Sequence, residues 1–336
     1  MNNGIFPFYD GINLRDGKSK YYFMLLKRIF EGDYALEQVE LCYCGRRELE
    51  VLSTQDRFAL PFGTKICRYC GLIQLSPRIS SRSLPNYYNE IYQGLILGDS
   101  CKELTTEDKA EDIYNYLEKY AIGNIKDKEI TIIEIGCGSG VKLNGVAVLC
   151  GKNGIKVRAL GCDYSASAKK MACARNIDCR LGNAASLIGE KADIVMLSHV
   201  IEHFVDIKAE FEVIKKLLNE GAYLYVEAPG VGDLINRKEY GYNYLIYSVM
   251  AHMYNFNLTS LRSVIEPLGF EFIAGDEYIH SIFRFNPSYC GKLDLSQNYT
   301  QVMAMLEAAE NKRKKIALTY KSKIKNCIRT WIRGSR

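Results

Sequence analysis

The sequence predicts an α/β protein built on a doubly wound, mostly parallel sheet. From residue 105 onward, short segments rich in Ile, Val and Leu alternate with segments long enough for helices. The first of these apolar segments runs straight into a turn of closely spaced glycines. The chain has 336 residues, of which 48% are hydrophobic and 25% charged, so it can bury one full-sized core and carry smaller additions.

The N-terminal part is expected to hold small elements. An amphipathic helix is predicted at Tyr21–Phe30, with Phe23, Leu26 and Ile29 or Phe30 on its apolar side. Residues 41–76 have the short apolar runs and glycines of a small β-rich module, and Ser76–Pro85 has the composition of a linker.

A regular pattern of helices and strands follows. A capped helix is expected from Thr105 to Tyr120. The predicted strands are Ile130–Ile135, Val157–Cys162, Ile194–Ser198, Tyr223–Glu227, Glu271–Ala274 and Ile282–Phe285. The chain therefore divides into an N-terminal region (1–90), a catalytic domain (91–290) and a basic tail (291–336).

A Gly-x-Gly-x-Gly turn directly follows the first predicted strand, in Glu134-Ile-Gly-Cys-Gly-Ser-Gly140. Glycines let the backbone turn tightly and let a ligand approach closely. The next strand ends in Asp163, an acid placed to bind the two ribose hydroxyls of an adenosine group. The spacing departs from the Gly-x-Gly-x-x-Gly of dinucleotide dehydrogenases, so a different adenosine cofactor is favoured.

These residues resemble the Rossmann-like class I S-adenosylmethionine-dependent methyltransferases over roughly residues 105–285. The resemblance rests on Glu134–Gly140, on Asp163-Tyr-Ser, and on Leu197-Ser-His-Val-Ile-Glu-His203 after the fourth strand. It implies S-adenosylmethionine as the cofactor, Asp163 on the ribose and Asn183 on the adenine. The residues that it assigns to the cofactor are Glu134, Gly136, Gly138, Gly140, Asp163, Tyr164, Asn183, Ala184, Ser198 and His199.

Two cysteine pairs, each followed by glycine, precede this domain: Cys42 with Cys44, and Cys67 with Cys70. Four thiolates in close pairs can bind one structural zinc ion, and twelve cysteines without an export signal favour reduced thiols. The first pair is C-x-C where C-x-x-C is usual, so four unrelated thiols are the alternative hypothesis. Core packing is expected for Cys137, Cys150, Cys162 and Cys173.

The cysteine pairs, with segments 71–77, 87–92 and 251–261, resemble bacterial sugar methyltransferases that have an N-terminal zinc-binding domain. Members of that family act on nucleotide-linked deoxysugars, and relatives modify surface polysaccharides. The resemblance implies a sugar or glycan substrate and places His252 on the catalytic base. Val249 and Ala251 replace the family's usual Tyr and Glu beside that histidine, which favours O-methylation over C-methylation of a nucleotide-sugar.

A histidine suits removal of a proton from a hydroxyl acceptor. The chain has four, at 199, 203, 252 and 280. His252 is the first choice as base, and His199, just beyond the fourth strand, is the second. For His203, hydrogen-bonded packing beside Glu202 is expected instead.

Two other functions are weaker hypotheses. RNA methyltransferases can also begin with a cysteine module, but a nucleic-acid substrate is disfavoured, because Ser198-His-Val-Ile201 replaces the Asn/Asp-Pro-Pro-aromatic turn used for planar amines. The charge balance agrees, because residues 311–336 hold ten of the 44 basic residues, which leaves 34 against 39 acidic ones. A cofactor-binding module without turnover is the third hypothesis, against which the intact glycine turn and Asp163 argue.

The stretch 312–333 predicts a basic amphipathic helix. Peripheral contact with an anionic membrane surface and packing on its own domain or a second subunit are equally weighted hypotheses. No run approaches the ~20 apolar residues of a membrane span, and the start lacks a signal-peptide pattern. A cytoplasmic protein is expected, at the inner face of the membrane if the tail binds there; the sequence does not indicate its oligomeric state.

Overall fold

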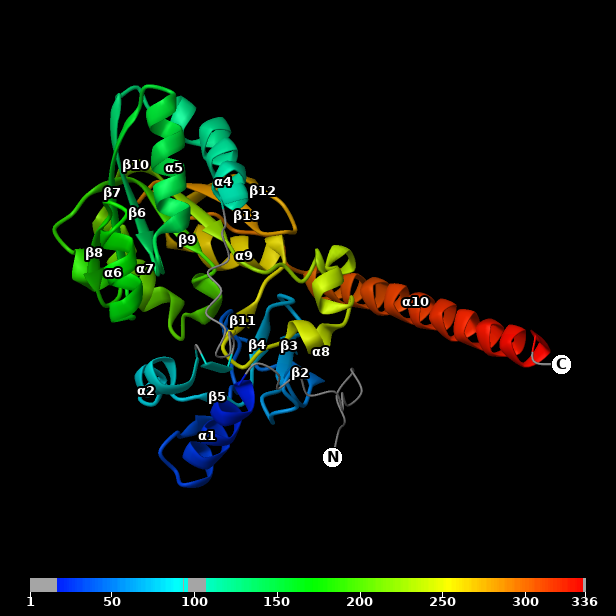
Figure 1. The fold of residues 1–336 in the computed structure, drawn as a ribbon. Coiled ribbons are helices and arrows are strands. Elements are labelled where there is room, and N and C mark those ends of the chain that lie inside the picture. The colour runs from blue at the N-terminus through cyan, green and yellow to red at the C-terminus, as the bar shows by residue number, and fades with distance from the viewer. Residues whose placement is uncertain (1–16, 93, 96–106, 335–336) are drawn as a thin grey trace.

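The computed structural model describes residues 17–92, 94–95 and 107–334 (Figure 1). Within them, a seven-stranded mixed sheet has the order β12-β13-β10-β9-β6-β7-β8, in which β13 runs antiparallel to both of its neighbours. The strands are β6 (Glu129–Ile135), β7 (Lys156–Asp163), β8 (Asp178–Leu181), β9 (Ala192–Ser198), β10 (Leu218–Glu227), β12 (Phe270–Gly275) and β13 (His280–Phe285). The predicted α/β class is confirmed, and β8 was not among the predicted strands.

Helices cover both faces of this sheet because its central strands are apolar on both sides. Ile194 and Met196 of β9 pack into a cluster with α4 (Glu107–Tyr120) and α5 (Val141–Lys152). Val195 and Leu197 pack into the opposite cluster, with α7 (Ile207–Leu217) and α9 (Leu258–Ile265). All four β9 residues are completely buried, and each such side chain contributes about 1.5–3 kcal/mol to folding. The short helix α6 (Ala166–Cys173) lies between β7 and β8 in the chain.

A smaller sheet contains the cysteine segment and has the order β11-β4-β3-β2. Its strands are β2 (Leu49–Ser53), β3 (Thr64–Cys67), β4 (Ile73–Leu75) and β11 (Tyr254–Asn255). The strand β11 comes from far along the chain and pairs with β4, at Tyr254 with Gln74 and Asn255 with Ile73. The small sheet is therefore completed by a segment that follows most of the large sheet.

The stretch Ser76–Pro85 is not a linker. It contains β5 (Arg78–Ile79), which pairs with β1 (Leu36–Glu37), and it leads into α2 (Leu84–Tyr87). Ile79 and Leu84 are buried in the core, and the N–H of Ser80 donates to the carbonyl of Ala35 at 2.8 Å. Burial of these two apolar side chains fixes a segment whose Ser and Pro content had suggested a free connection.

Two other predictions about packing are wrong. The first helix, α1 (Lys18–Phe30), turns Leu25 into the core and packs the predicted Leu26 and Ile29 against it. It leaves Phe23 and Phe30 64% and 94% exposed, so these two were wrongly placed on its apolar side. Cys173 is exposed because it lies at the last position of α6. The other three cysteines expected in the core are buried. The predicted start of α4 at Thr105 lies outside the described residues.

The last helix, α10 (Asn298–Gly334), packs on the protein at its beginning. Val302, Leu306 and Ala309 are buried in a cluster beside α8 (Tyr244–Tyr247). One turn later the Lys312 ammonium donates to the carbonyl of Ile235 at 2.8 Å. Beyond this point the helix projects away from the rest of the chain (Figure 1). None of the described helices is long and apolar enough to cross a membrane.

Candidate functional site

The glycine turn after β6 leaves one position open to a ligand. Gly136, Gly138 and Gly140 all have positive φ angles, of 67°, 54° and 76°. A Cβ atom on Gly140 would lie 2.3 Å from Cδ1 of Ile177, and one on Gly136 would lie 2.7 Å from Cγ2 of Val200. A Cβ on Gly138 would have no described heavy atom within 4 Å. The open face of Gly138 thus leaves room for a cofactor against the backbone.

Asp163 stands beside this turn because β6 and β7 are neighbours. Its Oδ2 accepts a hydrogen bond from the N–H of Gly138 at 3.0 Å, and its Oδ1 accepts one from the N–H of Ser165 at 2.8 Å. A carboxylate has about four acceptor positions, so further donors such as ribose hydroxyls can still bind.

Three more residues predicted to bind the cofactor, of which Asn183 was assigned to the adenine, lie in two loops. Tyr164 is 62% exposed next to Asp163. Asn183 caps the short helix Ala184–Leu187, and its Oδ1 accepts a hydrogen bond from the N–H of Ala185 at 3.2 Å. Ala184 is buried in the core, so little of it is accessible to a ligand.

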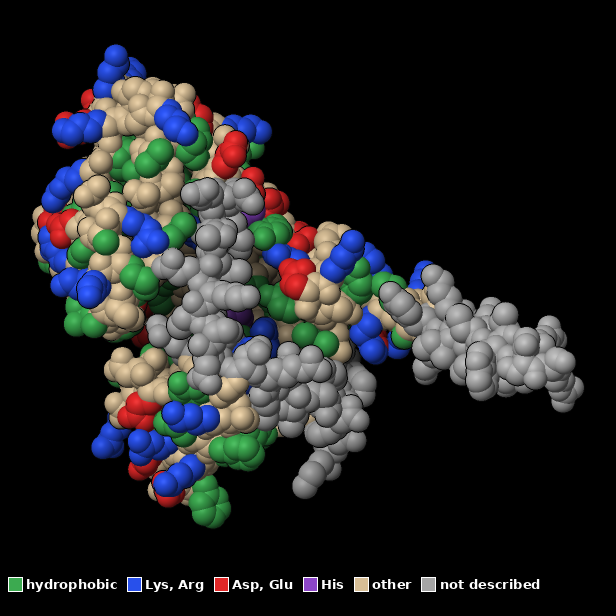
Figure 2. All heavy atoms as spheres, viewed as in Figure 1, with side chains coloured by type: hydrophobic (Ala, Val, Ile, Leu, Met, Phe, Trp, Pro, Cys, Tyr) green, Lys and Arg blue, Asp and Glu red, His purple; other side chains and the backbone are tan. Residues whose placement is uncertain are grey.

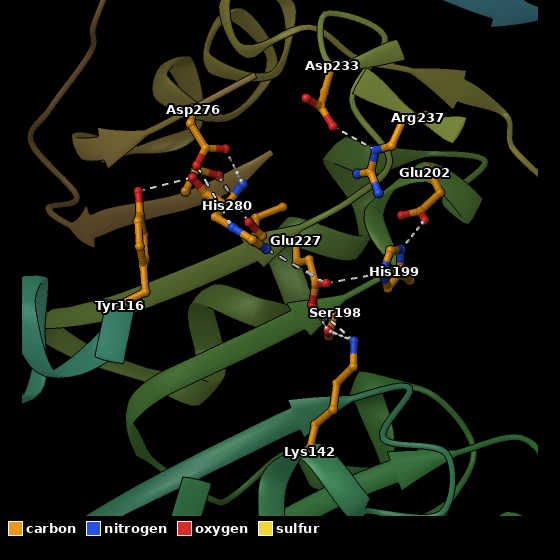
Figure 3. A network of polar contacts seen from close by, with 12 residues as sticks. Tyr116, Lys142, Ser198, His199, Glu202, Glu227, Asp233, Arg237, Asp276 and His280 are labelled. Carbon is orange, nitrogen blue, oxygen red and sulfur yellow. Dashed lines mark hydrogen bonds and ion pairs between the residues drawn. The ribbon is translucent and has the colours of Figure 1, made fainter. Parts of the chain in front are cut away.

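Glu134 is buried close to the carboxyl end of β6. Its Oε2 has no hydrogen-bond partner among the described residues. Burial raises the pKa of Glu134 to about 8, although the positive charge of Lys142 opposes the shift. The Lys142 ammonium instead donates to Oε2 of Glu227 at 3.0 Å and to the hydroxyl of Ser198 (Figure 3).

His199 lies between two carboxylates at the end of β9 (Figure 3). Its Nε2 is 3.2 Å from Oε1 of Glu227, and its Nδ1 is 3.6 Å from Oε1 of Glu202. Burial alone would lower the pKa of His199, but the two carboxylates outweigh it and raise that pKa. The residue has a φ of 58°, a strained conformation for a non-glycine residue, and its N–H donates to the carbonyl of Glu227 at 2.8 Å.

Glu202, His203 and His252 form a second cluster next to His199. One ligand atom from each of the three lies within 4.8 Å of the others. The Nδ1 of His203 is 2.8 Å from the carbonyl of Ala251, which confirms hydrogen-bonded packing for this histidine. Burial and the neighbouring His203 lower the pKa of His252 to about 3, so its imidazole is neutral at pH 7. Burial would raise the pKa of Glu202, but the His199 imidazole and the other histidines lower it to about 2.

The structure brings these groups together at one edge of the large sheet. Glu134, Asp163, Ser198 and Glu227 lie at or near the carboxyl ends of neighbouring parallel strands, where α/β proteins bind ligands. Histidine atoms reach the surface between the large and the small sheet (Figure 2).

Sequence reasoning missed part of this edge. Lys142 and Glu227 were not predicted, although Glu227 ends a predicted strand and could have been included on that ground. His280, on β13, lies 3.9 Å from the same Glu227 carboxylate, and its carbonyl accepts a hydrogen bond from the Tyr116 hydroxyl at 3.0 Å (Figure 3). The hydrogen bond of Tyr116 joins α4 to the sheet, and no pattern in the sequence around Tyr116 predicts it.

The four predicted cysteine ligands converge in the small sheet. The Sγ atoms of Cys42 and Cys70 are 3.5 Å apart, those of Cys44 and Cys67 are 3.7 Å apart, and all four lie within 4.8 Å. A tetrahedral zinc ion with bonds of about 2.3 Å holds its sulfur atoms about 3.8 Å apart. The glycine after each pair has a positive φ, which lets the chain fold back toward the same point.

Comparison with known proteins identifies the family of the domain that contains most of the large sheet. A family model for a methyltransferase domain matches residues 106–274, half of the chain. The chain belongs to this family. It is therefore an enzyme, a class I S-adenosylmethionine-dependent methyltransferase, as predicted. A comparison with curated protein sequences gave no match.

Several solved methyltransferase structures have a similar fold. A plantazolicin methyltransferase bound to a substrate analogue and S-adenosylhomocysteine is 16% identical; the match covers 66% of this chain and 89% of that one, with a TM-score of 0.46. A Thermotoga maritima S-adenosylmethionine-dependent methyltransferase is 14% identical, with 61% and 98% covered and a TM-score of 0.40. One from Methanosarcina mazei is 17% identical, with 49% and 96% covered and a TM-score of 0.36.

Proposed function

We propose that this methyltransferase methylates a hydroxyl group of a sugar, in a surface polysaccharide, a lipid-linked glycan or a nucleotide-sugar. The observation that carries the proposal is the cluster of Glu202, His203 and His252 beside the cofactor edge. A hydroxyl group must lose a proton when its oxygen is methylated, and this cluster offers groups that assist the loss. The resemblance of segments 71–77 and 251–261 to sugar methyltransferases supports a sugar as the acceptor.

The cofactor is assigned to the glycine turn and the strand ends around it. Bound S-adenosylmethionine supplies an electrophilic methyl group on its sulfonium. The Asp163 carboxylate accepts hydrogen bonds from the ribose hydroxyls at its free acceptor positions. Gly138 leaves space for the amino-acid part of the cofactor. Tyr164 and Asn183 border the adenine. Glu134, Ser198 and His199 lie at or next to the ends of β6 and β9 and are assigned to the cofactor as well.

We assign the activation of the acceptor hydroxyl to His252. A buried neutral imidazole offers a lone pair, and Nδ1 of His252 has no hydrogen-bond partner among the described residues. His199, the second choice, lies between two carboxylates, with Nε2 3.2 Å from Glu227 and Nδ1 3.6 Å from Glu202, so its ring faces negative charge on both sides. Its role in the proposal is to hold Glu202 and Glu227 in place.

We propose further that Cys42, Cys44, Cys67 and Cys70 bind a structural zinc ion. The sulfur–sulfur distances of 3.5 and 3.7 Å fit a tetrahedral site with about 3.8 Å edges. Four protein ligands leave no open coordination position, so this ion would stabilise the small sheet without taking part in catalysis.

The test of the function is a transfer assay with labelled S-adenosylmethionine. The purified chain is incubated with nucleotide-sugars, polysaccharide fragments, lipid-linked glycans and bulk RNA, and the product is examined by mass spectrometry and NMR for a methyl ether. The variant His252→Ala should lower kcat by about 10²-fold or more and leave cofactor affinity unchanged, because His252 acts on the acceptor.

Three results would contradict the proposal. A C-methylated sugar would assign the chain to the alternative reaction on nucleotide-sugars. Transfer to RNA, with binding that weakens steeply as salt rises, would assign it to nucleic acid. Full activity of His252→Ala on a sugar would show that His252 takes no part in the reaction.

A further inference from the structure

The carboxylate of Glu202 is buried in an unusual way. The residue is 1% exposed, and neither of its side-chain oxygens has a hydrogen-bond partner among the described residues. The Nδ1 atom of His199 lies 3.6 Å from Oε1 of Glu202, which is too long for a hydrogen bond. Burial of a charged group is strongly unfavourable unless the group is paired or binds a metal ion. Glu202 therefore has an ion-pair contact with His199, but neither of its oxygens receives a hydrogen bond from the described residues.

The hydrogen bonds of His203 decide which of its ring nitrogens is free to bind a ligand. Its Nδ1 is 2.8 Å from the carbonyl oxygen of Ala251, and a carbonyl can only accept, so Nδ1 carries the hydrogen. The Tyr88 hydroxyl lies 3.3 Å from the same nitrogen. The tautomer is thereby fixed, with Nε2 unprotonated. Histidines that bind metal ions are typically held in this way, through a hydrogen bond from the other ring nitrogen to a carbonyl or carboxylate.

His252 supplies the third group. Its Nδ1 is buried and has no partner among the described residues, and its ring centre lies 5.0 Å from that of His203. One ligand atom from each of Glu202, His203 and His252 lies within 4.8 Å of the other two. In a tetrahedral site with bonds of about 2.1 Å, such atoms lie about 3.4 Å apart, so small side-chain rotations bring them onto one ion.

We propose that Glu202, His203 and His252 bind a divalent transition-metal ion such as Mn²⁺ or Zn²⁺, with an acceptor oxygen as a further ligand. Two imidazoles with one carboxylate favour a transition metal over Mg²⁺ or Ca²⁺, which prefer oxygen ligands. Three protein ligands leave positions open for the acceptor, unlike the four-thiol site.

This inference rests on the proposed function, because it states how His252 activates the hydroxyl. Bound to the cation, the sugar hydroxyl becomes more acidic, its O–H bond breaks, and the proton passes to water. The oxygen lone pair then forms the bond to the methyl carbon, while the electron pair of the carbon–sulfur bond goes to sulfur and leaves S-adenosylhomocysteine. In this scheme His252 is a metal ligand.

The experiment is a titration of the full-length protein with Mn²⁺, followed by electron paramagnetic resonance, after one equivalent of zinc per chain has been added to fill the thiol site and unbound zinc has been removed. Manganese disfavours thiolates, so it reports on the second site. We expect one tightly bound Mn²⁺ per chain in the wild type. The variants Glu202→Gln and His203→Gln should bind it about 10²-fold more weakly or worse, since even the loss of an outer partner costs 10- to 100-fold. The matched control is Glu220→Gln, because Glu220 is an exposed carboxylate on β10.

The outcomes separate this inference from the proposed function. Loss of cofactor affinity together with a changed circular dichroism spectrum identifies a variant that has not folded. If Glu202→Gln does not fold, His203→Gln provides the second test. Wild-type protein that binds no Mn²⁺ or Zn²⁺ at this site, while metal-depleted protein still methylates a sugar, overturns the metal site and leaves the function standing. Loss of metal binding in both variants but not in the control supports the site even if the acceptor is not a sugar.

Discussion

Replacement of Gly138 or Gly140 by alanine should damage two different properties of the protein. Both glycines have a positive φ, and an alanine in that conformation costs about 1–2 kcal/mol. At Gly140 the new methyl group would also lie 2.3 Å from Cδ1 of Ile177 and 3.2 Å from Cβ of Ala172. Such crowding adds about 1–3 kcal/mol. Gly140→Ala should therefore lower the free energy of unfolding by about 2–5 kcal/mol, and Gly138→Ala by about 1–2 kcal/mol.

Cofactor affinity should show the opposite order. A methyl group on Gly138 would meet no described atom and so occupies the open space assigned to S-adenosylmethionine. We expect its dissociation constant to rise by about tenfold or more, equivalent to at least about 1.4 kcal/mol. A methyl group on Gly140 points at Ile177, away from that space, so the folded Gly140→Ala protein should bind the cofactor nearly as well as the wild type.

Urea unfolding measures the first quantity and isothermal titration calorimetry the second, both on the two variants and the wild type. If Gly138→Ala binds S-adenosylmethionine with wild-type affinity, the cofactor does not lie against this turn. If Gly138→Ala is instead the less stable of the two, the steric argument for Gly140 is wrong.

Three further predictions concern charge, the ribose and the thiols. Burial raises the pKa of Glu134 to about 8, so the folded chain holds a proton that the unfolded chain releases, and stability should fall as pH rises from about 4.5 to 8. Glu134→Gln should remove this pH dependence, which amounts to at most about 5 kcal/mol in the free energy of unfolding. Identical pH profiles of urea unfolding for the variant and the wild type would contradict the prediction. Asp163→Ala should weaken S-adenosylmethionine binding by about 10²-fold, because two charge-assisted hydrogen bonds to the ribose are lost; an unchanged calorimetric titration would exclude Asp163 from the site. Cys67→Ser, or a strong chelator, should remove one zinc ion per chain and lower the melting temperature. Metal analysis measures the zinc content and thermal unfolding measures the melting temperature. A zinc-free chain that melts at the wild-type temperature would show that the thiols need no metal.

The parts of the fold that the sequence predicts are those with a strong local pattern. Continuous apolar residues predict β6 and β9 because these strands are buried on both faces. The strand β8 lies at the sheet edge, and of its four residues only Cys179 is buried, so no apolar run reveals it. In α1 several hydrophobic residues follow one another, and helical spacing alone did not decide which of them would face the core.

The candidate site divides in the same way. The glycine turn and Asp163 form short motifs whose chemistry can be inferred from the residue types. The contact between Lys142 and Glu227 joins residues 85 positions apart, and only the strand order of the sheet brings them together. The cluster around Glu202 depends equally on a distant loop, because His252 is 50 positions away in the sequence.

The small sheet explains how that loop is held in place. The N–H of Met253, next to His252, donates to the carbonyl of Glu202 at 2.7 Å, and its own carbonyl accepts from the N–H of Leu75 at 3.0 Å. Leu75 ends β4, which follows the turn carrying Cys70 and pairs with β11 directly after Met253. One residue thus bridges the cysteine module and the end of β9. Because so small a sheet buries little apolar surface of its own, a metal ion bound by its thiols would stabilise the support on which His252 rests. The module would then contribute to catalysis by holding His252 in place, whereas the glycine turn after β6 and Asp163 at the end of β7 would bind the cofactor.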